Sequence, residues 1–341
     1  MTRWSSEKAP EKILIIRFHA VGDVAITLPY SCSFHRQVPE GVIDFLTTEV
    51  CADLGRSVTA FSNVLLFPFS KNRWIRLWHT AHWCFRIWRK QYKSIIDLQG
   101  NWVSKSLRVA GRPLRWAEFD RFSTKPAGQR VSDTFLRAGF DLHQREFAID
   151  VRKEVVEEAR ETLVNGGWDG RTKLVMLNPA GLFPTRNWPL EYFALLAHQW
   201  LKKENVTFLI VGTERVRTKA AILKKELGSS LIDLTAQTSL AQALGIIQFV
   251  SCVISEDSGL MHMAWVSGVP TVAMFGSTRS VWAKPLSPNS LSLSSSDLEC
   301  GDCESSVCKF GDVHCLTRYS PSFVLDKAVH LSGHYTPPEF L

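Results

Sequence analysis

Short apolar runs alternate with longer amphipathic segments along most of the chain. In the first half this pattern predicts strands at 13–18, 42–46, 64–67 and 94–98, with helical segments between them. A charged helix at 151–163 ends at Asn165-Gly166-Gly167, and strands are then predicted at 174–178, 207–211, 231–234, 252–255 and 271–275. The helices between them are predicted at 190–203, 215–227, 240–249 and 259–266, and the Ser-rich segment 287–296 is predicted to be a loop. Short buried strands that alternate with helices indicate βαβ units and parallel sheets.

The same alternation occurs twice, which indicates two α/β domains. The length of 341 residues agrees with this, since domains average about 150 residues. We therefore predict two Rossmann-like doubly wound domains, residues 1–165 and 166–341, that face each other across a cleft. Ligands of such sheets bind at the carboxyl ends of the strands, so the strand-to-helix turns are where chemistry is expected.

Composition narrows the class of protein. With 45% hydrophobic and 21% charged residues, the chain is not of the disordered, fibrous or disulfide-scaffold type. No run approaches the roughly 18 apolar residues of a membrane span, and the first twelve residues contain no apolar stretch. We therefore expect a cytoplasmic protein. The net charge of +7 indicates an anionic partner.

One turn in the second half has the features of an anion site. Asp257-Ser258-Gly259 follows a predicted strand and opens a helix that contains His262. Asp257 or Ser258 can cap this helix, and Gly259 lets a phosphate approach the backbone. An ordinary capped helix with a buried His262 is the alternative.

Two neighbouring turns supply further polar candidates. Gly181 and Arg186 lie between a predicted strand and a helix that starts at Pro189, and Arg186 could hold a phosphate or a sugar. Glu214 ends the next strand, where carboxylates bind ribose hydroxyls in nucleotide folds. A solvated arginine and a first-turn glutamate favoured by the helix dipole are the alternatives.

The first strand-to-helix turn contains Gly22-Asp23. A carboxylate at this position could be the general base towards a hydroxyl, although Asp is also common in first helical turns. The chain has no G-x-G-x-x-G turn and no Walker A loop, which argues against a dinucleotide dehydrogenase and a P-loop phosphotransferase.

Taken in order, these motifs resemble the family 9 glycosyltransferases, the bacterial heptosyltransferases of lipopolysaccharide assembly. The matching pieces are Gly22-Asp23 with Leu28-Pro29, Asp97-Leu98-Gln99-Gly100, Phe119-Asp120-Arg121, Asn178-Pro179, Arg186-Asn187-Trp188-Pro189, Asp257 through His262, and a terminal cysteine cluster. The resemblance implies a GT-B fold and inverting transfer of heptose from ADP-heptose to a sugar hydroxyl of the lipid A–core acceptor, without a cofactor.

The resemblance also implies roles for single residues. Asp23 matches the family's base, Ser258 and Gly259 its diphosphate turn, Asp257 its heptose contact, and Glu214 a ribose contact. Gly181, Arg186 and His262 are counted with the same donor site. Two alternatives stay open: a related heptosyltransferase that modifies a protein such as an autotransporter, and a catalytically idle module that binds sugar or nucleic acid.

Segment 71–93 carries seven Lys or Arg residues, no acid and four Trp residues. At 100° per residue, Trp74, Trp78, Ala81, Phe85 and Trp88 share one stripe, which we predict to be a core face. The opposite face, with Arg76, Arg86, Lys90 and Trp83, is predicted to contact the acceptor or an anionic membrane at the inner face of the inner membrane. We expect no nucleic-acid partner, since no nucleic-acid-binding signature is present.

Four cysteines gather near the end of the chain. Cys300, Cys303, Cys308 and Cys315, with His314 beside them, have the density of a structural Zn or Fe site. The resemblance includes this cluster. A group of reduced thiols in a loop is the alternative.

Overall fold

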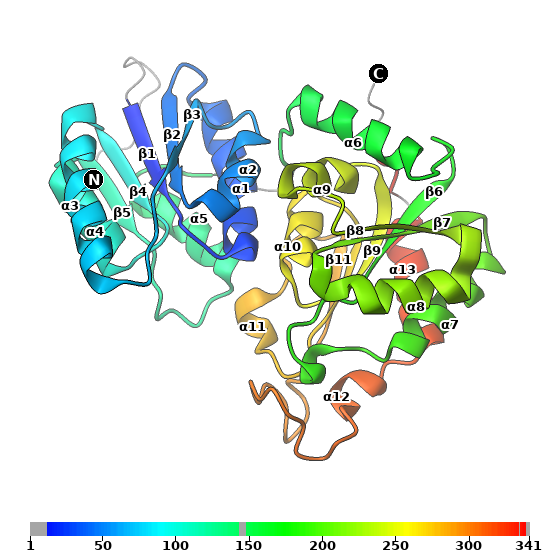
Figure 1. Ribbon diagram of the computed structural model, residues 1–341. Coiled ribbons are helices and arrows are strands. Elements are labelled where there is room, and N and C mark those ends of the chain that lie inside the picture. Colours follow the sequence, from blue (N-terminus) through cyan, green and yellow to red (C-terminus); the bar gives the residue numbers. More distant parts are fainter. Residues whose placement is uncertain (1–11, 143–147, 334, 339–341) are drawn as a thin grey trace. The chain divides into compact units, whose positions relative to one another are not determined.

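The computed structural model describes residues 12–142, 148–333 and 335–338. Residues 1–11, where the sequence predicts no secretory signal, lie outside the described residues. The chain divides into two compact units, residues 1–152 and 153–341. Each unit is a parallel sheet with helices on both faces (Figure 1), so the predicted pair of α/β domains is confirmed.

The first unit is built on a five-stranded sheet in the order β3-β2-β1-β4-β5. Its strands are β1 (Lys12–Ile16), β2 (Val42–Thr47), β3 (Asn63–Leu66), β4 (Ser94–Asp97) and β5 (Arg115–Glu118). Its helices are α1 (Val21–Gln37), α2 (Glu49–Arg56), α3 (Arg73–Lys90), α4 (Trp102–Gly111) and α5 (Ala127–Arg137). β5 was not among the predicted strands, because Arg115 and Glu118 interrupt the apolar pattern.

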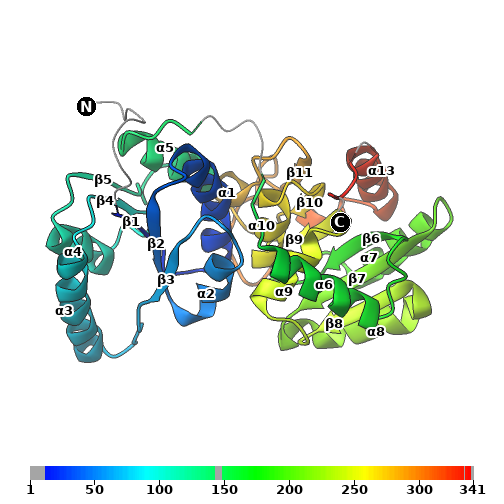
Figure 2. The same ribbon diagram turned by 90° about the horizontal axis from the view of Figure 1, so that it is seen from above.

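Helices α3 and α4 cover one face of this sheet, and α1 and α2 lie on the other side (Figure 2). The core beneath α3 and α4 joins Leu14 and Ile95 of the sheet to Trp83, Ile87 and Leu107 of the helices. β1 and β4 are buried on both faces, which agrees with the adjacent apolar residues Ile13–Ile16 in β1 and Ile95 and Ile96 in β4.

The second unit has a six-stranded sheet in the order β11-β10-β9-β6-β7-β8. Its strands are β6 (Lys173–Asn178), β7 (Val206–Gly212), β8 (Leu231–Thr235), β9 (Val250–Glu256), β10 (Thr271–Met274) and β11 (Ser290–Leu293). Its helices are α6 (Lys153–Asn165), α7 (Leu190–Leu201), α8 (Arg217–Leu227), α9 (Leu240–Ile247), α10 (Gly259–Val266), α11 (Ser280–Ala283), α12 (His314–Thr317) and α13 (Pro321–Ser332). Short 3₁₀ turns lie at η1 (Pro184–Arg186), η2 (Glu214–Val216) and η3 (Gly228–Ser230).

Two expectations about this unit differ from the structure. The Ser-rich segment contains β11, which pairs with β10 at the edge of the sheet, so the predicted loop is wrong there. Helix α6 lies in the second unit, whereas the predicted boundary at 165 placed it in the first. It packs on α9 so closely that a Cβ at Gly245 would lie 2.6 Å from the Val155 carbonyl oxygen.

The orientation of α3 is opposite to the prediction. Trp83 is 4% exposed, whereas Trp74 and Trp78 are 76% and 67% exposed. Thr80, Trp83 and Ile87 recur at helical spacing and form the inner face. Helical periodicity determines which residues share a face, but it does not determine which face is buried. Both faces of α3 carry aromatic side chains, and only one of them packs against the sheet.

Candidate functional site

The turn between β9 and α10 is the predicted anion site, and its local structure agrees with the sequence. Ser258 is the N-cap of α10, and its hydroxyl oxygen accepts a hydrogen bond from the Met261 amide at 3.3 Å. The Asn178 side-chain amide, at the end of β6, lies 2.7 Å from the hydroxyl oxygens of both Ser255 and Ser258. First-turn amides have no acceptor within a helix, and the helix dipole favours an anion there.

Arg186 and Asp257, which are 71 residues apart, meet at this turn. Their Nη1 and Oδ2 atoms are 3.4 Å apart, and both side chains are largely buried. The Thr278 hydroxyl donates to the same Asp257 oxygen at 2.8 Å. Within the described chain, Nε of Arg186 is buried and has no hydrogen-bond partner. The guanidinium, paired with Asp257, and the α10 terminus therefore lie at the same edge of the sheet.

Glu256 orders the loop that carries Arg186, and sequence reasoning missed it. Its carboxylate is fully buried and accepts hydrogen bonds from the amides of Gly181 at 2.6 Å and Trp188 at 2.7 Å. Burial raises the pKa of Glu256 to about 7, against the lowering effect of Lys219, whose Nζ is 3.7 Å away. An acid in the apolar stretch before Asp257 was the signal that could have identified it.

Gly181 is required by close packing. A Cβ at this position would lie 2.4 Å from the Arg186 carbonyl oxygen and 2.9 Å from a Glu256 carboxylate oxygen. Because the Gly181 amide donates to Glu256, the structure gives this glycine a part in shaping the loop.

Two other predicted donor residues already have protein partners. Glu214, in η2 after β7, is exposed and forms a bidentate pair with Arg217 at 2.5 and 2.7 Å, which lowers the pKa of Glu214. His262 is buried in α10, where its Nδ1 accepts a hydrogen bond from the Trp265 indole at 3.0 Å. Glu214 lies just beyond β7 rather than at its end, and His262 lies in the predicted helix.

In the first unit, Asp23 lies in the first turn of α1. Its Oδ1 is 2.8 Å from Nη2 of Arg17, and its Oδ2 accepts the Ala20 amide at 3.2 Å. The Asp23 side chain is about 41% exposed, whereas that of Arg17 is 7% exposed. The buried guanidinium and the first turn of α1 therefore fix the position of the Asp23 carboxylate. The arginine that ends an otherwise apolar run was a signal of this pair, and sequence reasoning did not use it.

The Asp97-Leu98-Gln99-Gly100 motif supports the turn that bears Asp23. Arg17 donates through Nη1 to the Leu98 carbonyl, and the Phe18 amide donates to the Gln99 side chain at 2.9 Å. Asp97 accepts the amides of Gln99 and Gly100, and Gly100 has a φ of +60°. The motif therefore fastens the turn after β4 to the turn after β1.

A pocket of about 670 Å³ opens at this edge of the first unit. It is lined by the turns after three neighbouring strands: 19–21 after β1, 48–51 after β2 and 66–69 at the end of β3. Its wall includes Ala20, whose amide donates to Asp23. This is where a parallel sheet binds its ligand, and the volume suits a sugar-sized group.

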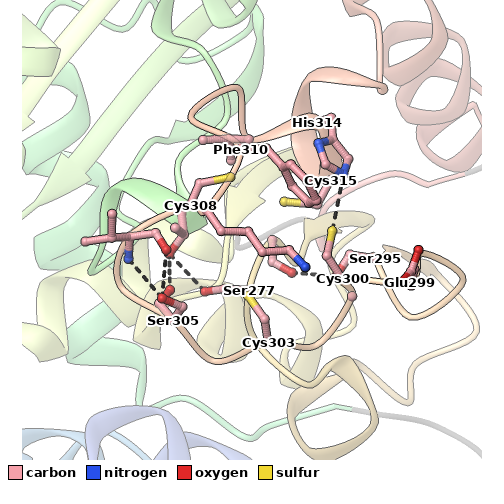
Figure 3. Close-up of a pocket in the computed structure, with 16 residues that line it drawn as sticks. Ser277, Ser295, Glu299, Cys300, Cys303, Ser305, Cys308, Phe310, His314 and Cys315 are labelled. Carbon is pink, nitrogen blue, oxygen red and sulfur yellow. Dashed lines mark hydrogen bonds between the residues drawn. The ribbon is translucent and has the colours of Figure 1, made fainter.

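The four terminal cysteines line one pocket of about 360 Å³ (Figure 3). Cys300 Sγ lies 3.2 Å from Nε2 of His314, and the pocket also touches Thr185, next to Arg186. Although burial opposes it, backbone amides of residues 310, 311 and 313 lower the pKa of Cys308. Burial and the neighbouring thiols raise the pKa of Cys315 to about 11.

The thiols converge, but they do not form a ready ligand set. Among the residues described, no group of three or more His, Cys, Asp or Glu side chains is placed to hold a metal ion.

The predicted basic face of α3 is divided among three environments. Arg76 is half-buried, with its guanidinium 5.8 Å from the Phe69 ring and 5.6 Å from the Trp102 ring. Lys90 pairs with the buried Asp44 at 2.8 Å. Arg86 is exposed and lies 4.3 Å over the Trp83 ring, which is itself buried. The placement of Trp83 on the outer face is therefore wrong, because that side chain belongs to the core. In the described part of the chain no helix is long and apolar enough to cross a membrane.

Comparisons with known proteins agree with the sequence motifs. The model of glycosyltransferase family 9 (heptosyltransferase) matches residues 84–314. Lipopolysaccharide heptosyltransferase 1 of Pseudomonas aeruginosa is 24% identical, with 97% of this chain and 99% of that protein covered. Lipopolysaccharide heptosyltransferase 2 of Salmonella typhimurium is 31% identical, with 81% and 86% covered.

Solved structures show the same fold. A family 9 glycosyl transferase from Veillonella parvula superposes with a TM-score of 0.82 at 18% identity, covering 96% of this chain and 99% of that one. The ADP-heptose lipopolysaccharide heptosyltransferase II of E. coli superposes with a TM-score of 0.72 at 17% identity, covering 94% and 98%.

Proposed function

This chain belongs to glycosyltransferase family 9, the heptosyltransferases, and from that premise we propose that it transfers heptose from ADP-heptose to a sugar hydroxyl of the lipopolysaccharide inner core. The family match over two thirds of the chain carries the proposal. The protein is thus a glycosyltransferase, and the two units supply the groups that an inverting displacement requires.

Asp23 is the general base of this proposal. It takes the proton of the acceptor hydroxyl as that oxygen bonds to the anomeric carbon of heptose, and the bond from that carbon to the diphosphate oxygen breaks. The contact with Arg17 orients the Asp23 carboxylate, and the partial exposure of Asp23 leaves it accessible to a hydroxyl. The pocket bounded by Ala20 is the proposed acceptor site.

The second unit holds the donor in this proposal. Ser258 and Gly259 at the α10 terminus and the Arg186 guanidinium bind the diphosphate, whose negative charge increases as ADP leaves. Asp257 accepts hydrogen bonds from heptose hydroxyls, Glu214 is the proposed ribose contact, and His262 is counted with the same donor site. Gly181 shapes the loop. These steps use the protein's own charged groups, so the reaction needs no cofactor.

A transfer assay tests the proposal. Purified protein with ADP-heptose and a lipid A–core acceptor lacking heptose should release ADP and raise the acceptor mass by one heptose. A mass increase on a co-incubated autotransporter fragment instead would support protein modification. Binding of ADP-heptose with no transfer to either acceptor would favour an idle sugar-binding module.

The acceptor also implies a location. Lipid A is held in a membrane, so we place the enzyme in the cytoplasm, peripherally bound at the inner face of the inner membrane. The net charge of +7 supports attraction to an anionic surface.

The cysteine pocket is a proposed structural Zn or Fe site. The thiols do not form a ready ligand set, so Cys300, Cys303, Cys308 and Cys315 would have to draw closer together around the metal ion. Thiolates are the preferred donors of closed sites. Elemental analysis should find about one metal per chain, and chelation should lower the melting temperature without abolishing ADP binding. A metal-free preparation with an unchanged melting temperature would contradict this proposal.

A further inference from the structure

The outward face of α3 carries four large aromatic side chains. Trp74, Trp78, Phe85 and Trp88 are 76%, 67%, 54% and 52% exposed. At 100° per residue they lie within an arc of about 80°, and we call them the aromatic stripe. Contiguous exposed apolar side chains on a folded protein mark an interaction surface more often than single ones do.

Cations flank the aromatic stripe. Lys71, Arg73, Arg86 and Arg89 are exposed, and segment 71–93 contains no Asp or Glu. Aromatic side chains beside a purely cationic flank are complementary to an anionic lipid surface, where Trp lies at the level of the headgroups. A second copy of the chain is a poor partner, because pairing two such helices would bring like charges together.

The opposite face of α3 anchors the helix without help from the aromatic stripe. Trp83 and Ile87 are buried against the sheet and α4. The Asn72 side chain caps the start of α3, and Lys90 pairs with Asp44 near its end. Figure 2 shows α3 at the outer edge of the first unit, beside α4. The helix has 18 residues and is therefore about 27 Å long, and it presents the aromatic stripe as a fixed surface.

We propose that α3 lies flat on an anionic phospholipid bilayer, inserts the aromatic stripe at the boundary of headgroups and acyl chains, and places its flanking cations among the lipid phosphates. This inference rests on the proposed function in one respect, namely that the acceptor is held in a membrane. It replaces the predicted contact through Arg76, Arg86, Lys90 and Trp83 with a different set of residues, of which only Arg86 is shared.

Vesicle sedimentation tests the inference directly. The stripe variant Trp74→Ser/Trp78→Ser/Trp88→Ser should bind vesicles of phosphatidylglycerol and phosphatidylethanolamine at least about tenfold more weakly than wild type. The control Trp282→Ser/Phe323→Ser removes two exposed aromatics of the second unit and should bind as wild type does. The charge variant Arg73→Gln/Arg86→Gln/Arg89→Gln should lose binding at low salt, where lipid attraction is unscreened.

Two results would overturn the inference. One is wild-type vesicle binding by a stripe variant with a native circular dichroism spectrum. The other is a wild-type dimer and a monomeric stripe variant that bind vesicles equally well, because the aromatic stripe would then be a self-association surface. A measurement on wild type tests the inference even if the variant misfolds. Vesicles of lipids with brominated acyl chains should quench the tryptophan fluorescence of the wild-type protein. No quenching at saturating vesicles would also contradict the inference.

Transfer to an acceptor dispersed in detergent separates this inference from the proposed function. The stripe variant should keep its turnover in detergent and lose it with acceptor in vesicles. A wild-type protein that binds vesicles but transfers no heptose would refute the function and leave the lipid surface intact.

Discussion

Two tryptophans of α3 provide a matched test of which face belongs to the core. Trp83 is 4% exposed, with its ring centroid 6.2 Å from that of Phe67, and Trp78 is 67% exposed. Truncating a buried Trp costs about 3–5 kcal/mol, so Trp83→Ala should lower the free energy of unfolding by that amount. Trp78 buries about a third as much of its side chain as Trp83, so Trp78→Ala should cost about 1–2 kcal/mol.

Urea denaturation followed by circular dichroism measures both values. The two variants remove the same side chain from the same helix, so helix propensity cancels between them. Equal costs, or a larger cost for Trp78→Ala, would refute the assigned orientation of α3 and would also remove the basis for the aromatic stripe.

Three further outcomes concern the site. Burial raises the pKa of Glu256 from 4.5 to about 7, so its stabilising contribution is complete below about pH 4.5 and disappears as the pH rises to 7. Between these pH values wild type should therefore lose about 3 kcal/mol of unfolding free energy, and Glu256→Gln should not show this loss. The same pH dependence of the unfolding free energy in variant and wild type would contradict the buried carboxylate. Arg186→Ala should weaken ADP binding in calorimetry and slow transfer, and unchanged values of both would leave Arg186 without a role in donor binding. Arg17→Met should lower kcat with little effect on ADP affinity, because Asp23 loses the guanidinium that holds its carboxylate in place; an unchanged kcat would leave Arg17 a purely structural role.

The parallel sheets could be predicted because their strands are buried on both faces and read as continuous apolar runs. Ile13–Ile16 of β1 and Phe208–Val211 of β7 are examples. β5 and β11 could not be recognised, because edge strands are half-exposed and their Arg, Glu and Ser residues resemble a loop.

Site residues were predictable where their role depends on neighbours in the sequence. The cap at Ser258 follows from local sequence, since the side chain bonds to an amide three residues away. The buried partners of the predicted residues, Arg17 and Glu256, were missed because their importance depends on tertiary contacts. Glu256 matters through the amides of Gly181 and Trp188, which lie about 70 residues away in sequence.

The most direct test of the account compares Asp23→Ala with wild type in two measurements on the same preparations. We predict that calorimetry gives the same affinity for ADP-heptose, because Asp23 lies in the first unit and the donor groups lie in the second. Heptose transfer to the lipid A–core acceptor should fall by about 10²–10⁴-fold, the usual contribution of a general base. Wild-type turnover in Asp23→Ala, or a loss of donor affinity equal to the loss of rate, would contradict the assignment of Asp23 as the base.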